Sequence, residues 1–93
     1  MLMTVEEVVT KVSISFDPMP GRERVAKAIE AALTREGKDQ KELAEASGVA
    51  ASTISDILKR RQNLTVPVAA RLGAVSWLKL SALRLMKMAL DEE

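Results

Sequence analysis

The chain has 93 residues, 47% of them hydrophobic and 2% aromatic, and its 14 basic and 13 acidic residues leave a net charge of +1. This length supports one hydrophobic core, and an apolar fraction made almost wholly of Ala, Val, Leu, Ile and Met favours packed helices, so we expect a single all-α domain. The absence of cysteine and histidine excludes disulfides, the usual zinc, haem and iron–sulfur sites, and Cys/His or Ser/His catalysis, so we expect neither an enzyme nor a cofactor.

Residues 1–20 form an N-terminal extension whose pattern favours two different structures. Thr4 and Glu7 make a capping box ahead of valines at helical spacing, which predicts a short helix over residues 5–11. From Val12 onward, apolar and polar residues alternate in "KVSISF", as in a half-buried strand that pairs with another copy of the chain. The extension is therefore a candidate dimerisation arm. No apolar run approaches the roughly 20 residues of a membrane span, so we expect a cytoplasmic protein.

The next two helices follow from apolar spacing and capping residues. After the turn "DPMPG", an i, i+3, i+4, i+7 stripe predicts an amphipathic helix that ends near Gly37. Asp39 precedes the next periodic stretch and Glu42 follows three residues later, so Asp39 is expected to cap a second helix that stops at Gly48. The stripe of the first helix consists of Val25, Ala28, Ile29, Ala32 and Leu33.

A third and a fourth helix are predicted before residue 74. Ile54, Ile57 and Leu58 give the third helix a buried edge, and the basic run Lys59-Arg60-Arg61 follows at its C-terminal end, where cations suit the helix dipole. Thr65 is expected to cap the fourth helix, with Pro67 in the first turn, where its missing N–H costs nothing.

Ser76 is expected to cap a fifth, long helix over "WLKLSALRLMKMAL". This segment has more apolar residues than one narrow stripe needs to cover a small core, so we expect part of it to meet another surface. The candidate dimer interface consists of Trp77, Leu78, Leu85, Met86 and Met88.

Residues 40–58 have the pattern of two short helices that cross at about 90 to 120°. Gly48 lies where the chain leaves the first of them, at a position where glycine most easily adopts a positive φ. Such a crossing buries Leu43, Ala44, Val49, Ile54 and Ile57. Together these residues predict a helix-turn-helix.

At this point the sequence resembles the lambda-repressor-like, or XRE-type, helix-turn-helix family over roughly residues 22–75. The likeness is carried by Gln40, Leu43, Ala44, Gly48, Val49, Ser52, Thr53, Ile54, Ser55 and Ile57. The segment Ile54-Ser55-Asp56-Ile57, Thr65 and the late Trp77-Leu78-Lys79-Leu80 are similar to the HigA-type antitoxin branch. The resemblance implies a five-helix domain over residues 21–93 whose C-terminal helix dimerises.

The family likeness also implies a mode of DNA binding. The helix that starts at Gln40 would lie across the sugar-phosphate backbone, and the third helix would enter the major groove with its N-terminal residues against base edges. Ser52 and Ser55 would contact base edges, alanine methyls would contact thymine methyls, and Gln40 would lie beside a phosphate. The candidate DNA-binding residues are Gln40, Ala50, Ala51, Ser52, Thr53, Ser55, Asp56, Lys59, Arg60 and Arg61.

Two of these residues depart from the family pattern. Asp56 occupies an exposed position of the recognition helix, where a carboxylate repels phosphate unless it accepts a hydrogen bond from the N4 amino group of cytosine. Arg60 stands where relatives often have a helix-ending glycine, so the chain is expected to leave this helix differently.

The main hypothesis is a nucleoid-associated, homodimeric repressor that binds double-stranded DNA at a palindromic operator. One recognition helix with few basic residues reads too few base pairs, whereas two related by a two-fold axis double the contact energy. The antitoxin likeness adds a cognate toxin as partner and autoregulation of a toxin–antitoxin operon. The alternatives are a phage or plasmid regulator without a toxin, and a protein-interaction module with little DNA affinity, which Asp56 and the balanced charge leave open.

Overall fold

The computed structural model describes residues 19–91, and over this range the chain forms five α-helices and one 3-10 helix, without a strand. The all-α prediction is therefore confirmed for this part of the chain. The predicted helix over residues 5–11 and the predicted strand "KVSISF" lie outside the described residues. The elements are α2 (Met19–Glu36), α3 (Gln40–Ser47), α4 (Ala51–Leu58), α5 (Val66–Gly73), η1 (Ser76–Leu78) and α6 (Ala82–Ala89).

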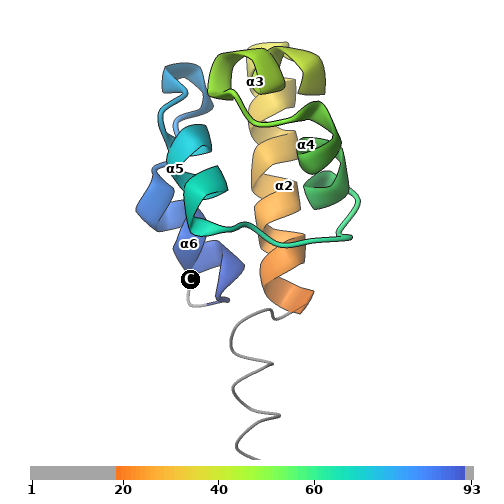
Figure 1. Cartoon of the computed structure of the whole chain (residues 1–93), viewed down its shortest axis with the longest axis vertical. Coiled ribbons are helices and arrows are strands. Elements are labelled where there is room, and N and C mark those ends of the chain that lie inside the picture. Colours follow the sequence, from red (N-terminus) through yellow and green to blue (C-terminus); the bar gives the residue numbers. More distant parts are fainter. Residues whose placement is uncertain (1–18, 92–93) are drawn as a thin grey trace, which may run out of the picture.

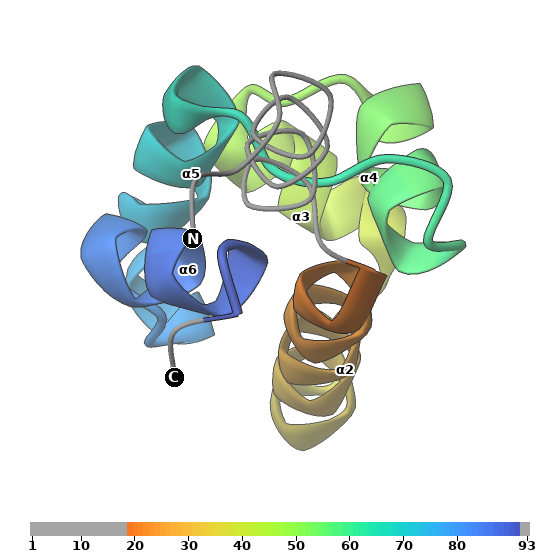
Figure 2. The same cartoon turned by 90° about the horizontal axis from the view of Figure 1, so that it is seen from below.

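The long helix α2 is the central support of the domain. It contacts α4 on one side and α6 and η1 on the other, and α3 lies across one end (Figure 1). Seen from below, α4 lies on one side of the domain and α5 and α6 lie on the other (Figure 2). Helix α4 is thus held by α2 and α3, and α5 packs chiefly against α6 and η1.

The core is wholly apolar in the described residues, since no polar or charged residue is buried there. The predicted stripe of α2 is confirmed: four of its five residues are buried, and Ala28 is half-buried against the core. Helical spacing alone suffices to identify this face because α2 is long enough for the apolar stripe to repeat over several turns. No helix between residues 19 and 91 is long and apolar enough to cross a membrane.

Close contact between α2 and α6 depends on Gly21. A Cβ at this position would overlap the carbonyl oxygen of Ala89 and lie 2.7 Å from the carbonyl carbon of the same residue. Since both atoms belong to the backbone of α6, a side chain at position 21 could be accommodated only by separating the two helices.

The predicted caps of α3 and α5 are confirmed. The backbone N–H of Glu42 donates to Asp39 Oδ1 at 2.8 Å, and the N–H of Val68 donates to Thr65 Oγ1 at 3.4 Å. Gly37 and Gly48, which follow α2 and α3, have φ of +64° and +76°. Each glycine therefore ends its helix in the left-handed conformation that its lack of a Cβ permits.

The prediction of one long fifth helix capped by Ser76 is wrong. The segment forms the short η1, turns at Lys79, whose φ is +57°, and begins again as α6, which Ser81 caps by accepting from the N–H of Arg84 at 3.1 Å. The physical reason is that Leu78 and Leu80 are both buried. Residues two apart on a continuous α-helix point about 200° from each other, so one helix could not have buried both side chains.

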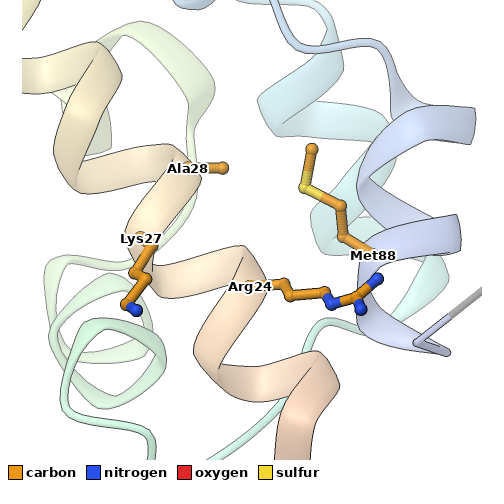
Figure 3. Close-up of a pocket in the computed structure, with 4 residues that line it drawn as sticks. All are labelled: Arg24, Lys27, Ala28 and Met88. Carbon is orange, nitrogen blue, oxygen red and sulfur yellow. The ribbon is translucent and has the colours of Figure 1, made fainter. Parts of the chain in front are cut away.

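The break changes the account of the predicted dimer interface. Leu78 and Leu85 have no exposed surface and Met88 keeps 7%, so the expectation that these side chains exceed what the core can enclose is wrong. Figure 3 shows the Met88 side chain directed from α6 toward Ala28 of α2. Trp77 and Met86 are half-buried against the core. The apolar side chain that α6 exposes most is Leu83, at 68%.

Candidate nucleic-acid interface

The crossing of α3 and α4 is built as the sequence predicts. Leu43, Val49, Ile54 and Ile57 are all buried, with at most 4% of their surface exposed, and Ala44 packs half-buried beside them. The N–H of Gly48 donates to the carbonyl oxygen of Ala44 at 2.9 Å, which closes the end of α3. These contacts fix the direction in which α4 leaves the turn.

Ser47 adds a support for this turn that the sequence pattern did not indicate. Its hydroxyl donates to the carbonyl oxygen of Leu43 at 2.7 Å and accepts from the N–H of Val49 at 3.1 Å. One side chain therefore ties the last turn of α3 to the residue that leads into α4. Serine is common in turns for this reason, but spacing alone does not show which backbone groups it will contact.

The leading end of α4 is slim and open to solvent. Ala50, Ala51 and Ser52 are exposed, and Ala50, the N-cap residue, makes no side-chain hydrogen bond to the first turn. Farther along the helix, Thr53 and Ser55 are half-buried. This end combines methyl groups with hydroxyl groups and has no bulky side chain that would keep it out of a groove.

Gln40 is the first residue of α3 and is exposed, as a phosphate contact requires. Its surroundings are less favourable to an anion than the sequence suggests. The Asp39 carboxylate already accepts the N–H of Glu42, and the Glu42 carboxylate lies 3.7 Å from Lys38 Nζ. Two carboxylates therefore stand at the helix end where the phosphate contact is predicted.

Arg60 is held by α2 at the C-terminal end of the recognition helix. Its guanidinium lies 2.7 Å from Glu23 Oε2 and 2.8 Å from Glu30 Oε1, and it also donates to the carbonyl oxygen of Leu58. The hydrogen bond from Arg60 lowers the pKa of Glu23, and the hydrogen bonds to Glu23 and Glu30 raise the pKa of Arg60. A phosphate contact by Arg60 remains a prediction, and a phosphate would have to compete with two carboxylates.

The backbone at Arg60 shows how the chain leaves α4 without a glycine. Arg60 has a φ of +61°, the left-handed conformation that glycine adopts more easily. Arg22 of α2 donates to the carbonyl oxygens of Arg60 and Arg61, each at 3.2 Å. The backbone and the side chain of Arg60 are therefore both attached to α2.

The other charged residues in and just after α4 remain at least partly exposed. Lys59 is exposed, and Arg61, whose side chain is 68% exposed, has Nη1 at 3.8 Å from Asp56 Oδ1. The Asp56 carboxylate is thus partly compensated by a cation of its own helix end. Within the basic run Lys59-Arg60-Arg61, both arginines therefore pair with carboxylates, whereas Lys59 forms no ion pair with a carboxylate of residues 19–91.

A basic residue outside the helix-turn-helix also reaches this region. Arg71 of α5 donates from Nη1 to the carbonyl oxygen of Gly48 at 3.2 Å. It lies at a cleft of about 270 Å³ between α5 and the start of α4, lined by Val49, Ala50, Thr53, Pro67, Val68 and Arg71. In the sequence Arg71 only continues the pattern of the fourth helix, 23 residues from Gly48, so spacing gave no signal of this contact.

A second hollow lies elsewhere and shares no residue with α3, α4 or α5. It has a volume of about 350 Å³, lies between α2 and α6, and is lined by Arg24, Lys27, Ala28 and Met88 (Figure 3). Both cations are paired, Arg24 with Asp91 at 3.0 Å and Lys27 with Glu23 at 3.5 Å. This hollow therefore offers less unpaired charge than the surface around α4.

Comparison with known proteins identifies the same region. A family model described as helix-turn-helix matches residues 29–75, just over half of the chain. The matched span begins in the second half of α2, contains α3, α4 and α5, and ends at Val75. No curated protein and no solved structure matches the chain.

Proposed function

Because the chain belongs to the XRE-type, lambda-repressor-like helix-turn-helix family, whose domains bind DNA, we propose that it is a homodimeric repressor of a palindromic operator. The observation that carries the proposal is the leading end of α4. Ala50, Ala51 and Ser52 are exposed and slim, while the buried edge of the same helix is fixed on α2 and α3. A rigid helix with an unobstructed N-terminal end suits insertion into the major groove.

In this proposal the residues in and around α4 have defined tasks. Ser52 and Ser55 donate to or accept from base edges, and the methyl groups of Ala50 and Ala51 contact thymine methyls. Lys59 and Arg61 bind phosphates on the backbone that borders the groove. Asp56, which Arg61 partly neutralises, accepts a hydrogen bond from the N4 amino group of cytosine instead of repelling the backbone.

The dimer interface is proposed on the exposed face of α6. Leu83 is 68% exposed, and Met86 and Leu90 are half-buried on the same face at i, i+3, i+7 spacing. If two α6 helices pack antiparallel about an axis near Met86, Leu83 of one copy faces Leu90 of the other, as a self-complementary two-fold contact requires. These three residues replace Leu78, Leu85 and Met88, which the core encloses.

An antitoxin role is the finer part of the proposal. It is supported by the likeness of Ile54-Ser55-Asp56-Ile57 and of Trp77-Leu78-Lys79-Leu80 to the HigA-type branch. In this role the protein binds a cognate toxin and represses its own operon. If the neighbouring gene product does not bind the purified protein in isothermal titration calorimetry, the phage or plasmid regulator becomes the better description.

Salt dependence of DNA binding tests the core of the proposal. Affinity for the DNA upstream of its own gene should fall steeply with salt in a fluorescence anisotropy titration, because bound phosphates release their counterions. Replacing Lys59 and Arg61 by alanine should reduce the log–log slope by roughly 0.9 for each phosphate that is no longer neutralised, summed over both copies. Lys27→Ala on α2 is the matched control and should leave the slope unchanged.

A slope near zero in the unmodified protein would refute DNA binding and favour the protein-interaction module. The dimer is tested separately by Leu83→Glu, which should give a folded monomer by circular dichroism and sedimentation at micromolar concentration. Ala31→Glu, at an exposed position of α2, should remain dimeric. Dimers of Leu83→Glu would mean that the interface lies elsewhere.

A further inference from the structure

The Arg71 guanidinium has no carboxylate beside it among residues 19–91, unlike the guanidinium groups of four other arginines. Arg24, Arg35, Arg60 and Arg61 each lie within 4 Å of a carboxylate. Arg71 instead donates to the carbonyl oxygen of Gly48, and no carboxylate of residues 19–91 forms an ion pair with it. A guanidinium has five N–H donors, so one hydrogen bond to a neutral carbonyl leaves most of them, and the full charge, for another ligand.

The position of Arg71 indicates the chemistry of that ligand. The cleft that it borders has apolar walls, the Thr53 side chain, and Ala50 at the start of α4. The N-terminal end of α4 has partial positive charge, because its first N–H groups point outward and Ala50 provides no cap. A cation beside this end raises the local positive potential, and no acidic side chain lines the cleft. An anion is therefore the complementary partner.

We infer that Arg71 binds a backbone phosphate of the operator and, through Gly48, positions the start of α4. This inference rests on the proposed function. The major groove is about 12 Å wide, close to the diameter of a helix with its side chains, so backbone strands pass on both sides of an inserted α4. Arg71 belongs to α5, which holds none of the DNA-binding residues predicted from the sequence. Its fork can donate to a phosphate while Nη1 keeps its bond to Gly48.

This dual contact gives Arg71 a role that charge alone would not provide. The carbonyl that it holds belongs to Gly48, the first residue after α3, which has the positive φ on which the turn depends. When the guanidinium is fixed by a phosphate, the turn is fixed with it. Phosphate binding on one side of the groove would thus orient the residues that contact bases.

The test compares three full-length variants on operator and unrelated DNA. Arg71→Gln keeps an N–H donor for Gly48 but loses the charge, so it should bind both DNAs at least about tenfold more weakly and lower the salt slope by roughly 1 per copy. Arg71→Lys should retain the slope. Arg24→Gln, which removes a cation paired with Asp91 on α2, is the matched control and should bind like the unmodified protein.

The outcomes separate this inference from the proposed function. A flat salt response of the unmodified protein refutes DNA binding itself. A steep response that Arg71→Gln shares in full refutes only the phosphate contact. Loss of operator binding by Arg71→Gln with an unchanged slope and a lowered melting temperature also overturns the phosphate contact, because it assigns Arg71 a purely structural role.

Discussion

Replacing Gly21 by alanine should test whether close contact between α2 and α6 holds the C-terminal half of the domain. The new Cβ would overlap the carbonyl oxygen of Ala89 and lie 2.7 Å from its carbonyl carbon and 3.0 Å from the carbonyl oxygen of Met88. Ordinary contact between such atoms needs about 3.5 Å. Because all three atoms belong to backbone, no side-chain rotation relieves the overlap, and α6 must move away from α2.

The size of the effect follows from what this movement exposes. Leu85, Met88 and Ala89 are buried on the face of α6 that packs toward the core, and a gap of about 0.5–1 Å already forfeits about a quarter to a half of each dispersion interaction. Overpacking of this kind costs typically about 1–3 kcal/mol, and we expect roughly 3 kcal/mol here. For a domain of this size that corresponds to a melting temperature about 12 to 24 °C lower.

Urea denaturation of the full-length chain, followed by circular dichroism, measures this loss. Gly37→Ala is the matched control, because no atom lies within 4 Å of its would-be Cβ and only the positive φ of +64° opposes the substitution. The control should therefore lose only about 1 kcal/mol. If the two variants lose the same stability, contact between α2 and α6 is not what Gly21 provides, and the reasoning fails.

Three further results are expected. The pKa of Glu23 in the folded protein is lowered chiefly by its hydrogen bond from Arg60. The contribution of the Glu23 carboxylate to stability is therefore present above its ordinary pKa of 4.5 and is lost as pH falls through its pKa in the folded protein. The stability difference between the unmodified protein and Glu23→Gln should shrink over that pH range in acid titrations, and a constant difference would contradict the assignment. Ser52→Ala and Ser55→Ala should each relax preference at one operator position by about 1 kcal/mol in a mutated-site binding series, whereas equal losses on every sequence would reassign them to phosphate contact or helix stability. Ser81→Ala removes the cap of α6 and should lower the free energy of unfolding by about 1 kcal/mol in urea, with a loss near zero ruling out that cap.

The elements of the helix-turn-helix were predictable because each depends on local pattern. The apolar spacing of α2, the caps Asp39 and Thr65, and the glycine at position 48 act over one or two turns, and the structure contains all of them. The break at Lys79 was not predictable from the same rules. It arises because two leucines two residues apart are both drawn into a core that other helices complete, and tertiary packing overrides the helical pattern there.

The candidate site likewise has features that the sequence predicts and features that only the folded structure shows. Exposure of the start of α4 follows from its burial pattern, and the sequence predicts it. The partners of Arg60 and Arg71 do not follow, because they lie 37 and 23 residues away in the chain. Only the folded arrangement shows that Arg60 is paired with carboxylates of α2 and that Arg71 faces the start of α4.

The missing cap on α4 has a consequence for the exchange of its backbone hydrogens with solvent. The other three eight-residue helices between Met19 and Asp91 begin with a side chain that accepts a first-turn N–H, whereas Ala50 offers none. Each of these caps accepts the N–H of the third helical residue, so the equivalent amide of α4, that of Thr53, should exchange more rapidly in the free protein than the amides of Glu42, Val68 and Arg84. At the other end of α4, the bonds from Lys59 and Arg61 to Ser55 and Asp56 keep the chain closed. The first turn of α4 is thus helical but lacks a side-chain cap at the end that is proposed to meet the bases, so bound DNA should slow the exchange of its amides.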